Sequence, residues 1–213
     1  MRQFIFICTL IICFTFSPLA VADSLKSASD GKTVLVFGDS LSAAYNIKRE
    51  QGWVSLLQDF VDQRNLSVKI VNASISGETS SGGLERFGDQ LTRTAPDIVI
   101  LELGGNDGLR GFDLDTTRAN LKTMIELSHQ QGAKVLLAGI QMPPNLGRTY
   151  TKRFAEIYQQ LGELENVYLI PFILEGVAAQ SNLMQADGIH PNAKGQPVIM
   201  QNVWQYLAPL IQP

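Results

Sequence analysis

Five short apolar runs alternate along this chain with segments that have helical periodicity. Parallel strands linked by right-handed helical crossovers form a sheet that is covered by helices on both faces. We therefore expect an α/β fold, a flavodoxin-like three-layer α/β/α sandwich around a five-stranded parallel sheet in the order 2-1-3-4-5. The expected strands are Thr33–Phe37, Val68–Ala73, Asp97–Leu103, Lys134–Ile140 and Val167–Pro171.

The segments between these runs carry apolar residues at the spacing of one helix face. Residues 52–64 show the pattern well, and an Asp115-Thr116 pair can cap a later helix that ends near Gln131. By contrast, residues 104–112 are expected to form a glycine-rich loop. Further helical segments are expected to end near Thr94, to span Thr149–Glu163 and Gln196–Ile211, and to make one or two turns in residues 173–179.

The first 22 residues have the pattern of a secretory signal peptide. Arg2 supplies a positive charge, Phe4–Phe16 is a short apolar stretch, and Ala20-Val21-Ala22 is a small-x-small cleavage site. The apolar stretch is short for a span of ~30 Å, so an uncleaved anchor is the less favoured alternative. We expect cleavage after Ala22, a periplasmic or secreted protein without a stable membrane anchor, and one domain over residues 23–213.

The composition excludes several classes of function. The chain has 17 basic and 20 acidic residues, which is not the basic footprint of a nucleic-acid-binding protein. Both cysteines lie within residues 1–22, and two histidines leave little material for a zinc site. We expect no metal and no other cofactor, a monomer, and any hydrolytic chemistry to depend on side chains.

Polar groups follow the expected strands at the points where they end. Ser40 follows the first strand, Ser76-Gly77 the second and Gly104–Asp107 the third, and Asp187 and His190 lie in the loop before the last helix. The carboxyl ends of parallel strands share one edge, where α/β folds bind ligands. The sequence therefore predicts that these groups meet at one site.

A serine hydroxyl is a poor nucleophile and needs a base to take its proton. His129 lies late in a polar helix and is expected to be an ordinary surface residue, which leaves His190 as the candidate base. Asp187, three residues earlier, can reach Nδ1 of His190 and orient the ring, although it can also simply close the loop. Asp39 is expected to be structural.

The oxyanion of an acyl-transfer intermediate needs preorganised hydrogen-bond donors. The candidates are the backbone N–H groups of Ser40 and Gly77 and the side-chain amide of Asn106. Taken singly, Gly77 is better interpreted as an ordinary turn glycine and Asn106 as a loop asparagine that satisfies local backbone.

Four blocks carry a resemblance to a known family: Gly38-Asp39-Ser40-Leu41, Gly77 in its Ser76-Gly77 turn, Gly104-Gly105-Asn106-Asp107, and Asp187-Gly188-Ile189-His190-Pro191. In this order they resemble the SGNH, or GDSL-type, hydrolases. The resemblance implies Ser40 as nucleophile, His190 as base, Asp187 as its orienting acid, and Gly77 and Asn106 as oxyanion donors. It also implies broad hydrolysis of acyl esters and acyl thioesters as small-molecule substrates, including acyl-CoA, lysophospholipids and aryl esters.

Apolar residues near this edge are candidates for binding an acyl chain. We expect the 104–112 loop to close over the chain and to help set the preferred chain length, although these residues can equally be core-facing anchors of their loops. The candidates are Ile75, Leu109, Phe112, Met142 and Ile189.

Two other functions remain compatible with the sequence. A carbohydrate O-deacetylase would use the same site on the same scaffold, with polar loops for the sugar. A non-catalytic flavodoxin-like binding domain would not depend on the Ser40 hydroxyl.

Overall fold

A computed structural model of the protein describes residues 31–178 and 180–211. The signal peptide predicted for residues 1–22 lies outside the described residues, as does Ala179, the last residue of the predicted 173–179 turns.

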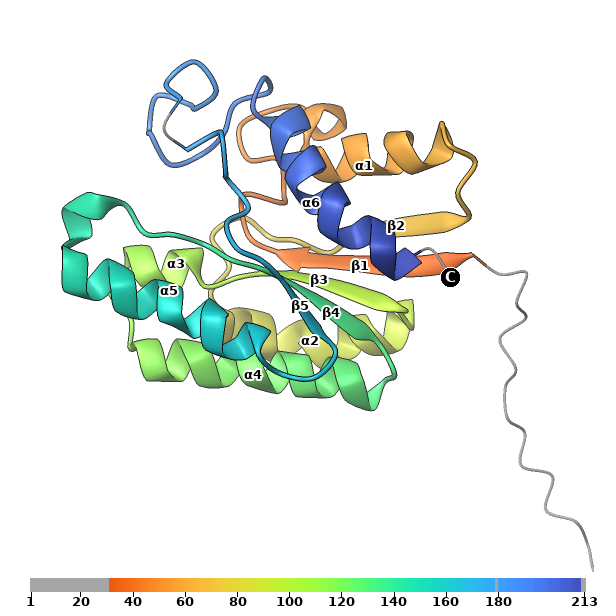
Figure 1. Cartoon of the computed structure of the whole chain (residues 1–213), viewed down its shortest axis with the longest axis horizontal. Coiled ribbons are helices and arrows are strands. Elements are labelled where there is room, and N and C mark those ends of the chain that lie inside the picture. Colours follow the sequence, from red (N-terminus) through yellow and green to blue (C-terminus); the bar gives the residue numbers. More distant parts are fainter. Residues whose placement is uncertain (1–30, 179, 212–213) are drawn as a thin grey trace, which may run out of the picture.

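The centre of the fold is a parallel sheet in the order β2-β1-β3-β4-β5, which confirms the expected topology (Figure 1). In register, Val34 of β1 lies opposite Ile70 of β2 and Ile98 of β3. All five residues of β3 are buried, as expected for a strand covered on both faces. The strands are β1 (Lys32–Gly38), β2 (Val68–Asn72), β3 (Ile98–Glu102), β4 (Lys134–Ala138) and β5 (Val167–Ile170).

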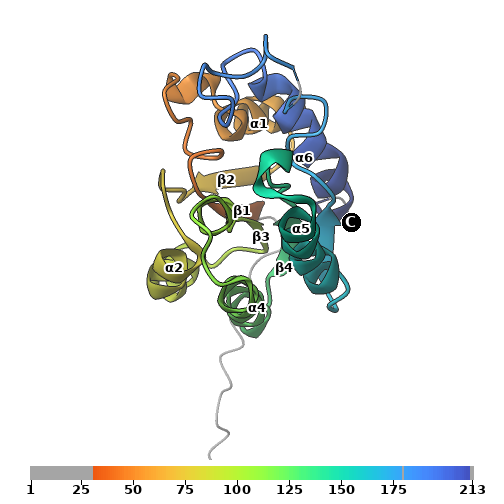
Figure 2. The same ribbon diagram turned by 90° about the vertical axis from the view of Figure 1, so that its left-hand side faces the viewer.

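Helices cover the two faces of the sheet. On one face lie α1 (Trp53–Asp62) and α6 (Gln196–Ile211), and on the other lie α2 (Ser80–Thr94), α4 (Leu114–Gln130) and α5 (Arg148–Gly162) (Figures 1 and 2). The short helix α3 (Gly105–Leu109) follows β3, and the 3₁₀ turns η1 (Arg49–Gln51) and η2 (Pro144–Leu146) lie in loops. The expected three-layer sandwich is therefore present.

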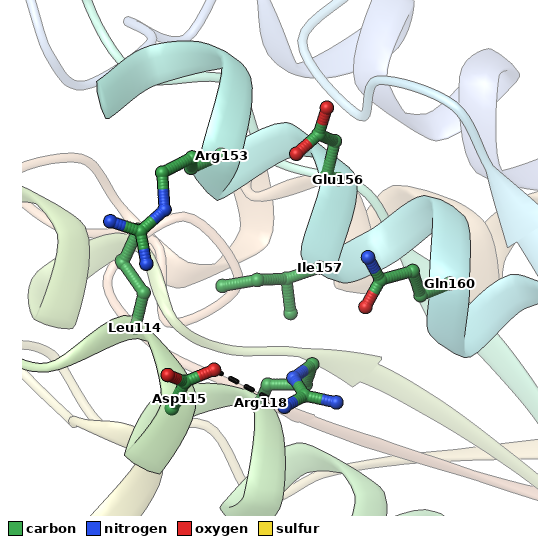
Figure 3. Close-up of a pocket in the computed structure, with 7 residues that line it drawn as sticks. All are labelled: Leu114, Asp115, Arg118, Arg153, Glu156, Ile157 and Gln160. Atoms are coloured by element: carbon green, nitrogen blue, oxygen red, sulfur yellow. Dashed lines mark hydrogen bonds and ion pairs between the residues drawn. The ribbon is translucent and has the colours of Figure 1, made fainter. Parts of the chain in front are cut away.

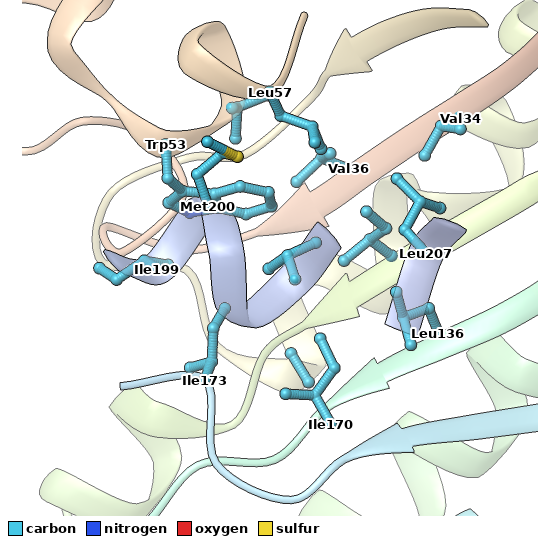
Figure 4. Packing of buried hydrophobic residues seen from close by; sticks show 14 of the residues in the cluster. Val34, Val36, Trp53, Leu57, Leu136, Ile170, Ile173, Ile199, Met200 and Leu207 are labelled. Carbon is cyan, nitrogen blue, oxygen red and sulfur yellow. The ribbon is translucent and has the colours of Figure 1, made fainter. Parts of the chain in front are cut away.

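The sheet divides the core into two apolar clusters because successive side chains of a strand point to opposite faces. Val34 and Val36 of β1 belong to the cluster under α1 and α6, whereas Leu35 and Phe37 belong to the other. Figure 4 shows the first cluster, where Leu207 of α6 packs among the strand side chains. Because β1 is held from both sides, its carboxyl end is a rigid support for the loop that follows.

Two local expectations differ from the structure. The 104–112 segment contains helix α3, which starts after Gly104 at a φ of 108°, a conformation that glycine adopts easily. Helix α4 is capped by Asp113, whose side chain accepts a hydrogen bond from Thr116 N at 2.8 Å, rather than by Asp115-Thr116. Residues 173–178 form successive turns, in line with the one or two turns expected there. Among the described residues, no helix is long and apolar enough to cross a membrane.

Replacing Leu207 with alanine tests the packing under α6. Leu207 is fully buried, so Leu207→Ala should lower the free energy of unfolding by about 2–5 kcal/mol. The control is Gln201→Ala at an exposed position of the same helix, with an expected change within about 0.5 kcal/mol. Urea denaturation measures both values, and equal changes in the two variants would contradict the packing.

Candidate active site

Ser40 lies just beyond the carboxyl end of β1, between the ends of β2 and β3. The turn that presents it is closed by Asp39, whose Oδ1 accepts a hydrogen bond from Leu41 N at 3.0 Å and whose carbonyl accepts one from Ala43 N at 2.9 Å. An aspartate that bonds to the backbone two residues ahead forms an Asx turn, which lets a strand end sharply. The hydroxyl is therefore presented at the edge of the sheet.

His190 and Asp187 lie against this serine. His190 Nε2 is 2.8 Å from Ser40 Oγ, and His190 Nδ1 is 2.8 Å from Asp187 Oδ2. The other oxygen of Asp187 accepts hydrogen bonds from the backbone N–H groups of Ile189 and His190. Partial burial opposes ionisation, but these bonds and the His190 side chain outweigh it and lower the pKa of Asp187 to about 2. The carboxylate can thus fix the orientation of the imidazole ring.

The loop that carries His190 is tied to the loop that carries Ser40. Gln185 N donates to His190 O at 2.7 Å, and the Gln185 side-chain amide donates to Tyr45 O at 2.9 Å. The ring of Tyr45 lies on the imidazole of His190 with their centroids 4.5 Å apart. Neither residue was predicted from the sequence. A cue for Tyr45 was its place five residues after Ser40, but no pattern marked Gln185.

Asn106 is the second residue of α3, and its Nδ2 donates to Asp39 Oδ2 at 3.0 Å. A primary amide has two N–H groups, so a second donor is available for a ligand. Gly77 lies in the loop after β2 at a φ of 79°, and its carbonyl accepts a hydrogen bond from the Arg110 side chain at 3.2 Å. Ile75 N donates to Gly38 O at 3.0 Å, which keeps this loop beside the end of β1.

A cavity of about 620 Å³ opens beside Ser40, Asn106 and His190. Of the predicted chain-binding residues, Leu109, Met142 and Ile189 line it, whereas Ile75 and Phe112 are exposed outside it. Gly77 is not part of its wall either. The loops after β4 and β5 supply apolar wall residues that were not predicted from the sequence, namely Ile140, Phe172, Leu174, Ala178 and Met184.

A second, smaller cavity of about 210 Å³ lies between α4 and α5, away from all the predicted site residues (Figure 3). Its wall is mainly charged, and Asp115 and Arg118 form an ion pair across 3.2 Å there. His129 lies in the last turn of α4, half-buried and outside the site. Within residues 31–178 and 180–211, no cluster of three histidine, cysteine or acidic side chains could hold a metal ion.

A serine, histidine and aspartate in this chain of hydrogen bonds are the arrangement that serine hydrolases use for acyl transfer, here at the edge of a parallel α/β sandwich. The model of the GDSL-like Lipase/Acylhydrolase family matches residues 36–198. The chain belongs to this family, the SGNH hydrolases, and is therefore an enzyme of that family.

Relatives of known name are similar to nearly the whole chain. Esterase TesA of Pseudomonas aeruginosa is 46% identical over 187 residues, which are 88% of this chain and 93% of that protein. Thioesterase 1/protease 1/lysophospholipase L1 of Escherichia coli K12 is 41% identical over 184 residues, 86% of this chain and 87% of that protein. The crystal structure of esterase EstA from Pseudoalteromonas sp., inhibited by monoethylphosphonate, has a TM-score of 0.80 at 42% identity and covers 84% of this chain and 97% of that one.

The Ser40 turn depends on a glycine before it. A Cβ added at Gly38 would lie 2.6 Å from Glu102 Oε2 and 2.9 Å from Glu102 O, inside a buried region. Gly38→Ala should lower the free energy of unfolding by about 1–3 kcal/mol, because the carbonyl of Glu102 is part of β3 and can shift only at a cost to the sheet. Gly88→Ala, on the exposed face of α2 with nothing within 4 Å, should instead raise it by up to about 1 kcal/mol. Urea denaturation checks both, and a neutral Gly38→Ala would contradict the tight fit.

Proposed function

We propose that this protein hydrolyses acyl esters and thioesters through an acyl-enzyme on Ser40. The observation that carries the proposal is the pair of 2.8 Å contacts that link Ser40 Oγ through His190 to Asp187. Hydrogen bonds of this length let His190 accept the serine proton, while Asp187 stabilises the resulting imidazolium.

In the first half-reaction, His190 Nε2 takes the proton of Ser40 as the serine oxygen bonds to the acyl carbon. The tetrahedral intermediate then expels the alcohol or thiol, which receives that proton, and the acyl group stays on Ser40. In the second half-reaction, His190 takes a proton from water as the water oxygen attacks the acyl-enzyme. The proton returns to Ser40 Oγ as the carboxylic acid leaves.

The negative oxygen of each intermediate requires donors that are already in place. The proposed donors are the backbone N–H groups of Ser40 and Gly77 and the free N–H of the Asn106 amide. All three are uncharged, so they stabilise the oxyanion without competing with it for a counter-ion. The hydrogen bond from Asn106 to Asp39 supports this role because it holds the amide at the cavity beside Ser40.

The cavity supports an acyl chain as the main recognised part of the substrate. Most residues of its wall are apolar, and its volume is within the range of small-molecule sites. The names of the relatives include esterase, thioesterase and lysophospholipase. We therefore propose aryl esters, acyl thioesters and lysophospholipids as the substrate class, with no metal or cofactor in the reaction. The pattern of residues 1–22 supports export of the enzyme.

Covalent labelling of Ser40 tests the acyl-enzyme. The unaltered protein should hydrolyse p-nitrophenyl esters and lose this activity when an organophosphonate adds to the peptide that contains Ser40, as mass spectrometry can locate. Ser40→Ala should take no label and should lose at least about 10⁴-fold in kcat. Labelling elsewhere, or full activity of Ser40→Ala, would favour a non-catalytic binding domain instead.

The two histidines provide a matched test of the base. His190→Asn should lower kcat by roughly 10⁴-fold because nothing else in the site can take the serine proton. His129→Asn should leave kcat within about twofold, because the half-buried His129 lies in the last turn of α4, outside the site. Steady-state hydrolysis of one p-nitrophenyl ester compares them, and equal losses would exclude His190 as the specific base.

The length of the acyl chain is the variable that the cavity should control. Ala178 is an exposed residue of the cavity wall in the turns after β5, so Ala178→Trp should obstruct long chains and spare an acetyl group. We expect kcat/KM for decanoyl relative to acetyl esters to fall by about 10–100-fold. Glu175→Trp, exposed in the same turns but outside the wall, should leave this ratio unchanged. An unaltered ratio in Ala178→Trp would place the chain elsewhere, for instance under the 104–112 segment.

A further inference from the structure

Two acidic side chains lie buried beneath Ser40, and neither is part of the Ser40–His190–Asp187 chain. Glu102, the last residue of β3, is fully buried, and Asp39 is 2% exposed. Within the described ranges, the hydrogen-bond partners of these two carboxyls are backbone N–H groups, a hydroxyl and an amide, without a lysine or arginine. Two carboxylates at this depth with no cation cannot both be ionised at low cost.

The surroundings of Asp39 suit the ionised form. Its Oδ1 accepts from Leu41 N at 3.0 Å and its Oδ2 accepts from Asn106 Nδ2 at 3.0 Å, so both oxygens face donors. A carboxylate accepts hydrogen bonds and cannot donate them, and therefore it must face the NH₂ end of the amide. This contact decides that Asn106 turns its nitrogen, and not its carbonyl oxygen, toward Asp39 and the edge of the cavity.

The surroundings of Glu102 suit the neutral form. Its Oε2 accepts from Ser42 Oγ at 2.7 Å and from Asp39 N at 3.2 Å, whereas its Oε1 is buried with no hydrogen-bond partner. An unpartnered oxygen of a buried carboxylate costs far more free energy than the same oxygen of a neutral acid. The proton of the pair therefore belongs on Glu102.

We propose that Asp39 and Glu102 form a buried acid pair with a single negative charge, carried by Asp39, and that this charge positions the Asn106 amide as an oxyanion donor. The inference rests on the proposed function, since it explains how one of the proposed donors is held. Asp39 acts through Asn106 and does not touch the reacting atoms, so it is a positioning residue, and Glu102 supports it by staying neutral.

The charge environment agrees with this division. Burial raises the pKa of Glu102 well above its ordinary value, and the negative charge of Asp39 raises it further. Burial also raises the pKa of Asp39, to about 6, although the hydrogen bonds from Leu41 and Asn106 and the nearby His190 limit that rise. Asp39 therefore remains ionised at neutral pH. The other acid close by, Asp107, is engaged by the backbone N–H and the hydroxyl of Ser80 at 2.9 and 2.6 Å.

Two isosteric amide substitutions separate the role of the Asp39 charge from that of the neutral Glu102 side chain. Asp39→Asn removes the charge. The backbone N–H of Leu41 cannot turn over, so the new amide keeps its oxygen toward Leu41 and places its NH₂ group opposite Asn106. The Asn106 amide should then turn over, and its donor should be lost from the cavity. We expect kcat to fall by about 10–100-fold with little change in KM. This loss is smaller than the roughly 10²–10³-fold loss of kcat expected when an oxyanion donor is removed altogether. Glu102→Gln remains neutral and should keep kcat within about threefold, because it resembles the protonated acid.

A double-mutant cycle identifies the route by which Asp39 acts. If Asp39 works through Asn106, then Asp39→Asn should cost almost nothing more in kcat once Asn106→Ala has removed the amide. Melting temperatures of all the variants show whether each still folds. Infrared spectroscopy at neutral pH supplies a readout independent of activity, a protonated-carboxyl band that Glu102→Gln should abolish.

Two results would overturn the acid pair in an enzyme that otherwise hydrolyses esters: an equal loss of kcat in Asp39→Asn and Glu102→Gln, or a full Asp39→Asn effect in the Asn106→Ala background. A protonated-carboxyl band unaffected by Glu102→Gln would overturn the assignment of the proton. Failure of the proposed function has a different signature, because the unaltered protein would then neither hydrolyse esters nor label at Ser40.

Discussion

One hydrogen bond, 2.8 Å between Ser40 Oγ and His190 Nε2, joins positions 150 residues apart, and much of the structure holds its two ends in place. At one end, β1 is buried on both faces, so the turn after it cannot move as a flexible loop would. At the other end, Asp187 binds both the ring and the backbone of His190, and Gln185 ties that loop to Tyr45. A contact that depends on two separate loops is precise only when each loop is anchored.

The buried acidic side chains beneath the site show that this anchoring has a cost in desolvation free energy. Asp39, Glu102 and Asp107 are all buried at or just beyond strand ends, where carboxyl groups are expensive to desolvate. Each is engaged by hydrogen bonds, and a satisfied buried network of this kind is rigid. Rigidity matters for the proposed chemistry because oxyanion donors are effective only when they need no rearrangement during the reaction. The unpartnered oxygen of Glu102 is the exception, and it costs less free energy on a neutral side chain than on a carboxylate.

Much of the fold followed from local sequence patterns, and the deviations have identifiable causes. The sheet order is confirmed because alternation of strands and helices with right-handed crossovers leaves few topologies. Helix α3 was missed because its glycines argue against a helix. In the folded protein, Asp107 is held by Ser80, and Gly108 O accepts a hydrogen bond from Tyr150 at 2.8 Å. These partners come from α2 and α5, so local propensity gives no sign of them.

The sequence by itself determined the alternation of elements and the position of Ser40, Gly77 and Asn106 after successive strands, because residues at strand ends share one edge whatever the details of packing. It also placed Asp187 within one turn of His190, since three residues cannot separate them far. Only the tertiary structure decided which apolar residues face the cavity and which, like Ile75 and Phe112, stay outside it. It alone set Tyr45 on His190 and brought Asp39 and Glu102 together. The physical reason is that such contacts depend on how loops from distant strands pack against one another. A local sequence pattern carries no information about that packing.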